Sequence, residues 1–314
     1  MLPESIQYIL NKKAELIQTN ALKQSVENFT NHYRDNKGAL AKDPIQSSCD
    51  ALAYALTRMP ATYSVTEEVL SRVPKANHAH YKKILDIGCG TGAVLTALHN
   101  YFFDAYIEGV EKNPYMRNLA YELTNKNIIN ATLESFVPTE AYDLVTIAYV
   151  LNEIKNPADF YKKLWSMTKN TLVIIETGTP RGFEIIESIR KFFLENQKGH
   201  IIAPCPHEKT CPLLEIPNRW CHFEKRVART KYHKDLKANA ARGFEDEPFS
   251  YLIISRDKPS EVKTGARFIS RVHGNKILSA DLCKADGTFE NIKISKRDEA
   301  YKDIRNATWG DYSE

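Results

Sequence analysis

The spacing of apolar side chains predicts helices along the first part of the chain. Residues 4–34 carry apolar positions at helical spacing. The stretch 49–59 is rich in good helix formers and stops at Pro60, and residues 62–73 predict a further helix. We therefore expect residues 1–80 to form an N-terminal helical cap rather than a domain with a large core of its own.

Beyond residue 82 the pattern changes to short apolar runs that alternate with helical segments. The predicted strands cover residues 83–87, 106–110, 128–133, 143–148 and 171–176. The predicted helices lie around residues 92–101, 114–124 and 157–168. This alternation favours an α/β fold with a Rossmann-like parallel sheet, helices on both faces, and a ligand at the carboxyl edge of the strands.

The second half of the chain interrupts and then ends this pattern. A stretch rich in proline and cysteine, 198–222, excludes a regular helix or a central strand. The segments that follow are a basic helical run at 224–242, a strong strand at 249–255, and short β-like runs at 266–272, 276–282 and 289–294. We expect a sheet domain over 81–258 with a cysteine-rich insertion at 198–242, and a small β-rich extension over 259–314.

Composition and charge narrow the class of protein. No apolar run is long enough for a transmembrane helix, and the first residues resemble neither a signal peptide nor a transit peptide. We therefore expect a cytoplasmic monomer with no membrane partner. Residues 219–242 carry eight Lys or Arg against two acids, which suits either a phosphate backbone or a solvated basic helix.

A glycine-rich loop follows the first predicted strand. The strand ends in Asp86, the loop reads Gly88-Cys-Gly-Thr-Gly92, and Glu111 ends the next strand about 20 residues on. Glycines let a backbone approach a ligand closely, and a carboxylate at the second strand end can accept both hydroxyls of a ribose. A nucleotide cofactor is the expected ligand, and an unused or NAD-type pocket is the alternative.

The loop resembles motif I of class I S-adenosylmethionine-dependent methyltransferases, usually written D-x-G-x-G-x-G. That resemblance implies that the loop glycines line the methionine part of the cofactor and that Glu111 binds its ribose. It also implies that Glu134 and Ser135 lie beside the adenine, with Ala148 and Tyr149 near the transferred methyl group. The full set of expected cofactor-binding residues is Asp86, Gly88, Gly90, Gly92, Glu111, Glu134, Ser135, Ala148 and Tyr149.

No catalytic residue can be named from the sequence. Methylation of ring nitrogens often uses an Asn/Asp-Pro-Pro-aromatic tetrapeptide after the fourth strand, but this chain reads Ala148-Tyr-Val-Leu-Asn-Glu153 there. A cysteine nucleophile, as in carbon-5 methylation of cytosine, would be Cys205, which has another explanation. Methyl transfer can also proceed by proximity alone.

Four cysteines suggest a metal site. They are Cys205, Cys211, Cys221 and Cys283, and two of them precede proline. Thiolates bind zinc and iron–sulfur clusters, and Cys-Pro is frequent at cluster ligands. The spacing is looser than in most zinc knuckles, so the sequence leaves three alternatives open, namely a cluster, zinc or unligated thiols. His207 and His222 are alternative ligands.

Several further motifs resemble the Rsm22-like methyltransferase-related proteins of the small ribosomal subunit. They are Ala51–Tyr63, Glu176–Phe183, Cys205–Leu213, Trp220–Phe223, Phe249–Leu252 and Cys283–Gly287. The resemblance implies a role on the small subunit and its rRNA during assembly. It also implies a [4Fe–4S] cluster held by Cys205, Cys211, Cys221 and Cys283, with zinc as the alternative, beside S-adenosylmethionine.

Three functions remain open at this point. The first is an S-adenosylmethionine-dependent methyltransferase that modifies small-subunit rRNA. The second is a non-catalytic assembly factor that uses the methyltransferase fold and a cluster to dock on RNA. The third is a methyltransferase for small molecules or proteins that carries a zinc loop.

Overall fold

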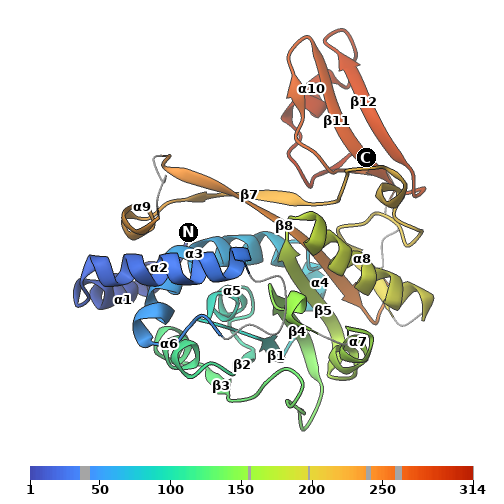
Figure 1. Ribbon diagram of the computed structural model, residues 1–314. Coiled ribbons are helices and arrows are strands. Elements are labelled where there is room, and N and C mark those ends of the chain that lie inside the picture. The colour runs from blue at the N-terminus through green and yellow to red at the C-terminus, as the bar shows by residue number, and fades with distance from the viewer. Residues whose placement is uncertain (36–42, 155–156, 197–198, 238–241, 259–263, 314) are drawn as a thin grey trace. The chain divides into compact units, whose positions relative to one another are not determined.

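The chain packs as two compact units. The computed structural model describes residues 1–35, 43–154, 157–196, 199–237, 242–258 and 264–313 (Figure 1). Unit 1 comprises Met1–Lys169 and Lys225–Glu247, and unit 2 comprises Asn170–Glu224 and Pro248–Glu314. These boundaries differ from residues 80 and 258, and the division into three parts stays a prediction.

Unit 1 begins with helices, as the apolar spacing predicts. They are α1 (Glu4–Glu15), α2 (Thr19–Asp35), α3 (Ser48–Leu70) and the short α4 (Lys75–His78). The Ser47 side chain begins α3 by accepting a hydrogen bond from the Asp50 amide at 3.1 Å.

The predicted end of a helix at Pro60 is wrong, because α3 runs through this residue. A proline inside a helix removes one backbone hydrogen bond and costs about 3 kcal/mol. Most side chains of α3 are buried on both sides of Pro60, so the apolar surface that a continuous helix buries outweighs this cost.

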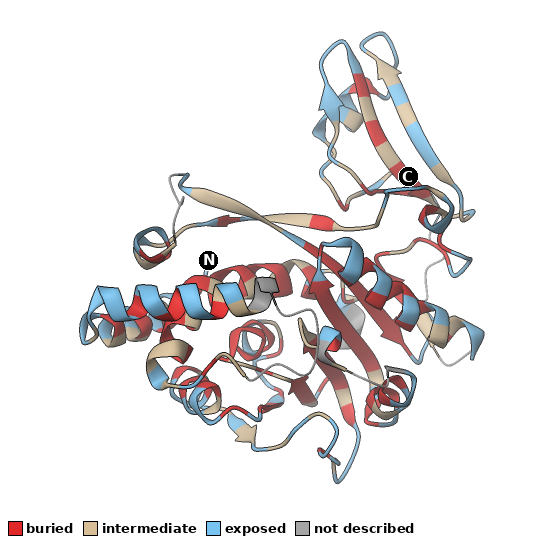
Figure 2. Cartoon of the chain, viewed as in Figure 1, coloured by how far each residue is buried: buried red, intermediate tan, exposed pale blue. Residues whose placement is uncertain are grey.

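A parallel sheet forms the centre of unit 1, which confirms that prediction. Its strands are β1 (Lys83–Ile87), β2 (Tyr106–Val110), β3 (Asn127–Ile129) and β4 (Tyr142–Ala148), in the order β3-β2-β1-β4. The elements that follow these strands are α5 (Ala93–Tyr101), α6 (Pro114–Thr124), η1 (Leu151–Glu153) and α7 (Pro157–Ser166). Figure 2 shows the buried character of β1 and β4. Strands and helices in this order form an α/β fold with a Rossmann-like parallel sheet.

The third strand is shorter than predicted. It ends at Ile129 rather than at residue 133. The next residues instead form a local turn, in which the Thr132 amide donates to the Ser135 hydroxyl at 3.0 Å. Side chains of this kind compete with a strand ladder for the backbone.

The remaining part of unit 1, Lys225–Glu247, is called the arm below. The basic helix predicted over 224–242 is wrong for most of its length. The arm contains most of β7 (Phe223–Ala228), the six-residue helix α9 (Lys231–Leu236) and the start of β8 (Phe244–Ser255), which pairs with β7. Buried Val227 lies between the exposed Arg226 and Ala228, which is a strand pattern that the run of basic residues hides.

Ion pairs hold the arm against α3. Lys225 lies 2.8 Å from Glu68, and Arg58 lies 2.8 Å from Glu247. Within the arm, the carboxylate of Glu245 lies 3.2 to 3.6 Å from nitrogen atoms of Arg229, His233 and Lys237.

Unit 2 contains antiparallel sheet and a cysteine-rich loop. Its elements are β5 (Thr168–Thr177), α8 (Pro180–Glu195), β6 (His200–Ala203), η2 (Pro212–Glu215) and most of β8. Strand β8 pairs antiparallel with both β5 and β6. The Thr179 side chain caps α8 by accepting from the Gly182 amide at 3.1 Å.

The predicted C-terminal β-extension is a small antiparallel sheet in unit 2. It consists of β9 (Ala266–Phe268), β10 (His273–Gly274), β11 (Ile277–Lys284), β12 (Phe289–Ser295) and β13 (Tyr312–Ser313), with α10 (Tyr301–Asn306) after β12. Strand β11 pairs with β9, β10 and β12. Over the residues that the structure describes, no helix has the length and apolar character needed to cross a membrane.

The charges around Glu245 make the stability of unit 1 depend on pH. Burial alone would raise the pKa of Glu245, but His233, Lys237 and Arg58 outweigh burial and lower it from 4.5 to about 2. The resulting stabilisation is present above pH 4.5 and is lost as the pH falls towards 2. We expect Glu245→Gln to lower the free energy of unfolding by about 2–3 kcal/mol at pH 7, and by progressively less in denaturant titrations below pH 4.5.

The control is Glu184→Gln, because Glu184 is exposed on α8 and pairs with Arg181 at the surface. This control should change stability little at any pH. A Glu245→Gln effect that stays constant between pH 3 and pH 7 would contradict the assignment.

Candidate cofactor site and cysteine cavity

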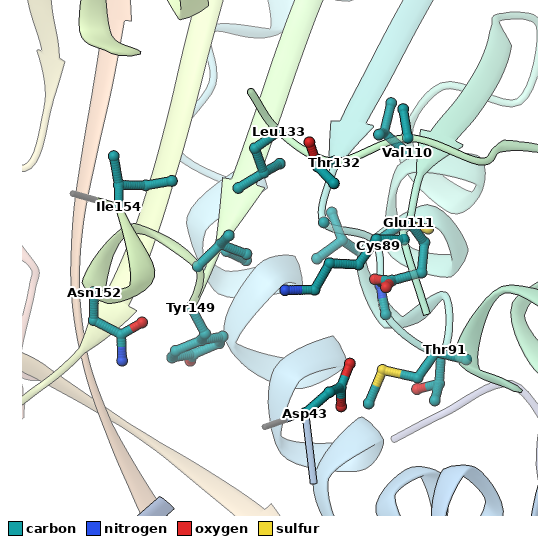
Figure 3. Close-up of a pocket in the computed structure, with 18 of the residues that line it drawn as sticks. Asp43, Cys89, Thr91, Val110, Glu111, Thr132, Leu133, Tyr149, Asn152 and Ile154 are labelled. Carbon is teal, nitrogen blue, oxygen red and sulfur yellow. The ribbon is translucent and has the colours of Figure 1, made fainter. Parts of the chain in front are cut away.

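A cavity of about 750 Å³ lies in unit 1 at the carboxyl ends of the parallel strands. Six of the predicted residues line it, namely Gly88, Gly90, Glu111, Glu134, Ala148 and Tyr149. Asp86, Gly92 and Ser135 are close in sequence to these residues but do not line the cavity. Figure 3 shows how side chains from several loops surround it. Its volume is in the range of small-molecule and cofactor sites.

The glycine loop has the backbone that the motif requires. Gly88, Gly90 and Gly92 all have positive φ, of 70°, 53° and 87°, which only glycine adopts without strain. A Cβ at Gly88 would lie 2.7 Å from Val150, whereas a Cβ at Gly90 would meet nothing closer than 3.9 Å. Gly90 therefore exposes bare backbone to the open cavity.

Glu111 is fixed by two backbone groups. Its carboxylate accepts hydrogen bonds from the Gly90 amide at 3.0 Å and from the Asn113 amide at 2.7 Å. Burial raises the pKa of Glu111, and these two hydrogen bonds oppose that rise. The carboxylate thereby joins the loop after β1 to the loop after β2, and its remaining lone pairs stay available to a ligand.

Asp86 is buried at the end of β1. One of its carboxylate oxygens accepts from the Thr146 hydroxyl at 2.7 Å, and the other has no hydrogen-bond partner among the described residues. Burial, with a smaller contribution from the charge of Glu111, raises the pKa of Asp86 to about 8.

The cavity also contains residues that were not predicted from the sequence. Asp43, Tyr54, Asn152 and Lys163 line it, and Figure 3 labels Asp43 and Asn152. The Asn113 side chain donates to the Asp43 carboxylate at 2.9 Å, which ties the segment before α3 to the start of α6. Tyr54 alone had a signal in the sequence, because it falls within the stretch 51–63 that resembles the Rsm22-like proteins.

A second, small cavity of about 30 Å³ lies in unit 2. All four predicted metal ligands line it, namely Cys205, Cys211, Cys221 and Cys283. Arg190, His207 and Arg267 complete its polar lining, and the Cys283 sulfur lies 3.3 Å from the Nε2 atom of His207. The fold therefore gathers four cysteines that are spread over 79 positions of the sequence.

The same thiols are not arranged around a single point. No group of three or more His, Cys, Asp or Glu in the described chain is close enough to hold one metal ion. Burial and the neighbouring sulfur atoms raise the pKa of Cys211 and of Cys283 to about 12, and they also raise the pKa of Cys221 well above its usual range. The metal loop predicted from the cysteines stays a prediction.

The basic stretch 219–242 has fewer free charges than its composition suggests. Arg219 pairs with Asp281, Lys225 with Glu68, Arg226 with Asp246, and Arg229 and Lys237 with Glu245. Among the described residues, Lys231, Lys234 and Arg242 have no such pair. Most basic side chains of the arm therefore form ion pairs within the protein, and few remain available to bind a phosphate backbone.

Two known proteins are similar in sequence to parts of this chain. The human protein "Ribosome assembly protein METTL17, mitochondrial" is 25% identical over 289 residues, which cover 83% of this chain and 62% of that protein. "Ribosome assembly protein RSM22, mitochondrial" of Saccharomyces cerevisiae is 26% identical over 216 residues, which cover 44% of this chain and 34% of the yeast protein. This chain thus spans less than two thirds of either relative.

Two further comparisons concern the fold and the family. The solved structure of the plantazolicin methyltransferase BpumL in complex with SAH is 17% identical, covers 80% of this chain and 99% of its own, and has a TM-score of 0.38. The family described as "Mitochondrial small ribosomal subunit Rsm22" matches residues 48–313. Because this match extends over most of the chain, the protein belongs to the Rsm22 family.

Proposed function

We propose that this protein binds S-adenosylmethionine in the 750 Å³ cavity of unit 1 and methylates rRNA of the small ribosomal subunit during its assembly. One observation carries the proposal, namely that the glycine loop and Glu111 line one cavity and are hydrogen-bonded to each other. Membership of the Rsm22 family supports the small subunit as the partner. We keep the cytoplasm as the proposed compartment, although both relatives carry the word mitochondrial in their names.

Each end of the cavity suits a different part of the cofactor. The Glu111 carboxylate suits the two ribose hydroxyls, and the exposed backbone at Gly90 suits close approach of the methionine part. Glu134 lies beyond β3, where the adenine would lie. Tyr149 and Asn152 follow β4 and line the part of the cavity where the methyl group would react.

Methyl transfer needs a nucleophile on the RNA and a site that excludes competing orientations. S-adenosylmethionine held by the glycine loop and Glu111 would supply an electrophilic methyl group to a nucleophilic nitrogen, oxygen or carbon of the RNA, and the proton displaced from that atom would pass to solvent. Asn152 is exposed in the cavity and can orient a base, but it can neither take nor give a proton at neutral pH. Positioning is therefore the main contribution that we assign to these residues.

A second candidate is an assembly factor that binds the cofactor without using it. The printed names of both relatives describe ribosome assembly proteins. The Asn/Asp-Pro-Pro-aromatic tetrapeptide is missing after β4, where the sequence reads Ala148-Tyr-Val-Leu-Asn-Glu153, and its absence is also compatible with a protein that docks on RNA without modifying it. In this alternative the cavity would stabilise the fold through ligand binding.

We also propose a [4Fe–4S] cluster in unit 2, held by Cys205, Cys211, Cys221 and Cys283. Sulfur atoms bound to one tetrahedral zinc lie about 3.8 Å apart, and a cubane holds its four ligands farther apart. Thiols that share one cavity without converging on one point suit the larger group better. When bound, the cluster would cross-link an irregular loop that has little regular structure of its own. Zinc is the alternative.

The first test concerns the cofactor. Gly90→Ala adds a methyl group that the protein itself has room for, but this group would occupy the space of a ligand that approaches the backbone. The positive φ of Gly90 adds a strain of about 1 kcal/mol. We expect at least about a tenfold loss of affinity for S-adenosylmethionine in calorimetric titration.

The matched control is Gly243→Ala, at a glycine in the arm where an added Cβ would have no atom within 4 Å. The affinity of Gly243→Ala for S-adenosylmethionine should equal that of the wild type. If Gly90→Ala binds the cofactor as tightly as the wild type, the proposed binding mode is wrong.

The second test concerns the metal. Protein purified without oxygen should be brown and contain about four iron and four sulfide per chain. Cys211→Ser should lose most of both, because one of four ligands is missing, whereas Cys49→Ser should retain them. A colourless wild-type protein with one zinc per chain would show that the bound metal is zinc and not a cluster.

The third test separates the enzyme from the assembly factor. A deletion strain should accumulate immature small subunits and lack one methyl group that mass mapping finds in the wild-type rRNA of that subunit. The variant Gly90→Ala should restore assembly less well than Gly243→Ala. If every modified nucleotide is unchanged while subunits remain immature, methyl transfer is excluded and the assembly factor is the correct alternative.

A further inference from the structure

Arg267 is a buried cation without an acidic partner in unit 2. It lies in β9, and its side chain is almost fully buried. Its guanidinium donates to the Gly310 carbonyl and lies 4.0 Å from the ring centre of Tyr312. No carboxylate among the described residues forms an ion pair with it, and its Nε atom has no hydrogen-bond acceptor there.

Arg190 is a second buried cation whose polar partners are incomplete among the described residues. It is also almost fully buried, and its guanidinium donates to the carbonyls of His207 and Lys209. Its carboxylate partner, Glu187, is 3.5 Å away, and its Nε atom again lacks an acceptor in the described chain. Both arginines line the cysteine cavity.

Among the described residues that line this cavity, the buried positive charges exceed the negative ones. Arg190 and Arg267 contribute two positive charges, and Glu187 contributes one negative charge. An arginine is almost never fully buried unless an anion compensates it, so the surplus positive charge calls for an anion in or beside the cavity.

All four cysteines line the same cavity as both arginines. Four thiolates around a [4Fe–4S]²⁺ core, or around Zn²⁺, carry a net charge of −2. Such a group would supply the missing anion within the cavity that both arginines line.

We propose that Arg267, assisted by Arg190, is the counter-charge of an anionic four-thiolate metal group in the cysteine cavity. This inference rests on the metal group of the proposed function, and it assigns positioning and electrostatic roles to residues that are not ligands. Removal of the charge leaves the anion buried with less compensation, which weakens metal retention. It also disfavours the reduced cluster, whose net charge is −3, and thereby lowers the reduction potential.

The experiment compares three variants of the full chain, purified without oxygen, with the wild type. Arg267→Met removes the charge and keeps an unbranched side chain, and Arg267→Lys keeps the charge. Arg271→Met is the matched control, because Arg271 is exposed and pairs with Glu224. We measure iron, sulfide and zinc content, the rate of metal loss to a chelator, and the potential at which dithionite adds one electron to the cluster.

We expect Arg267→Met to lose metal about tenfold faster than the wild type and to be reduced at a lower potential. Arg267→Lys should recover most of both properties, and Arg271→Met should match the wild type. Circular dichroism identifies a variant that fails to fold. If Arg267→Met fails to fold, Arg190→Met provides the same comparison at the second arginine that lines the cavity.

The outcomes separate the two proposals. A wild type that contains metal, with Arg267→Met and Arg190→Met unchanged in retention and potential, overturns the counter-charge and leaves the metal group in place. Equal losses in Arg267→Lys and Arg267→Met also overturn it, because shape rather than charge would then matter. A wild type without iron or zinc overturns both proposals.

Discussion

The cofactor cavity depends on one carboxylate that two backbone amides hold in place. Glu111 accepts from Gly90 and from Asn113, so the loops that follow β1 and β2 cannot move independently. Asn113 extends the same connection, because its side chain caps α6 and also reaches Asp43 and Ile45. A buried carboxylate is unfavourable unless its hydrogen bonds are made. The need to satisfy Glu111 therefore determines the shape of the glycine loop.

The cost of burying a charge without partners also distinguishes the two units. In unit 1 the buried acid is satisfied by the protein's own amides, and the cavity is complete before any ligand binds. In the cysteine cavity of unit 2 the buried arginines outnumber the described carboxylates. Unit 1 thus satisfies the buried carboxylate of Glu111 itself, whereas unit 2 holds buried cations for which the proposed metal group would supply the anion.

The sequence predicted those features that depend on local chemistry. The strands at 83–87 and 106–110 and the helix at 114–124 have the predicted bounds, because the apolar periodicity that predicts them is a local signal. Pro60 was misread because its cost is offset by burial along all of α3, which a local rule does not include. The arm was misread because its basic residues have partners far along the chain, such as Glu68 for Lys225.

The candidate sites likewise divide into residues that a local motif or residue type reveals and residues that only the folded structure reveals. The glycine loop and Glu111 follow a short motif, and the four cysteines were recognised by residue type. Asp43, Tyr54 and Asn152 were missed because no motif connects the segments before β1 and after β4 to the loop that they face. Arg190 and Arg267 were missed for a related reason, since only burial distinguishes them from the other arginines of the chain.

The backbone of Tyr149 bears on how the cofactor cavity is used. This residue has a φ of 59°, a conformation that costs a side-chain-bearing residue roughly 1–2 kcal/mol and that glycine would adopt freely. A tyrosine at this position is therefore kept for its side chain, which lines the cavity beside Asn152 at the end of β4 (Figure 3). An aromatic ring and an amide next to the expected methyl group can stack on a base and hydrogen-bond to its edge. Strain of this kind favours a site that holds a nucleobase over an unused remnant of the fold.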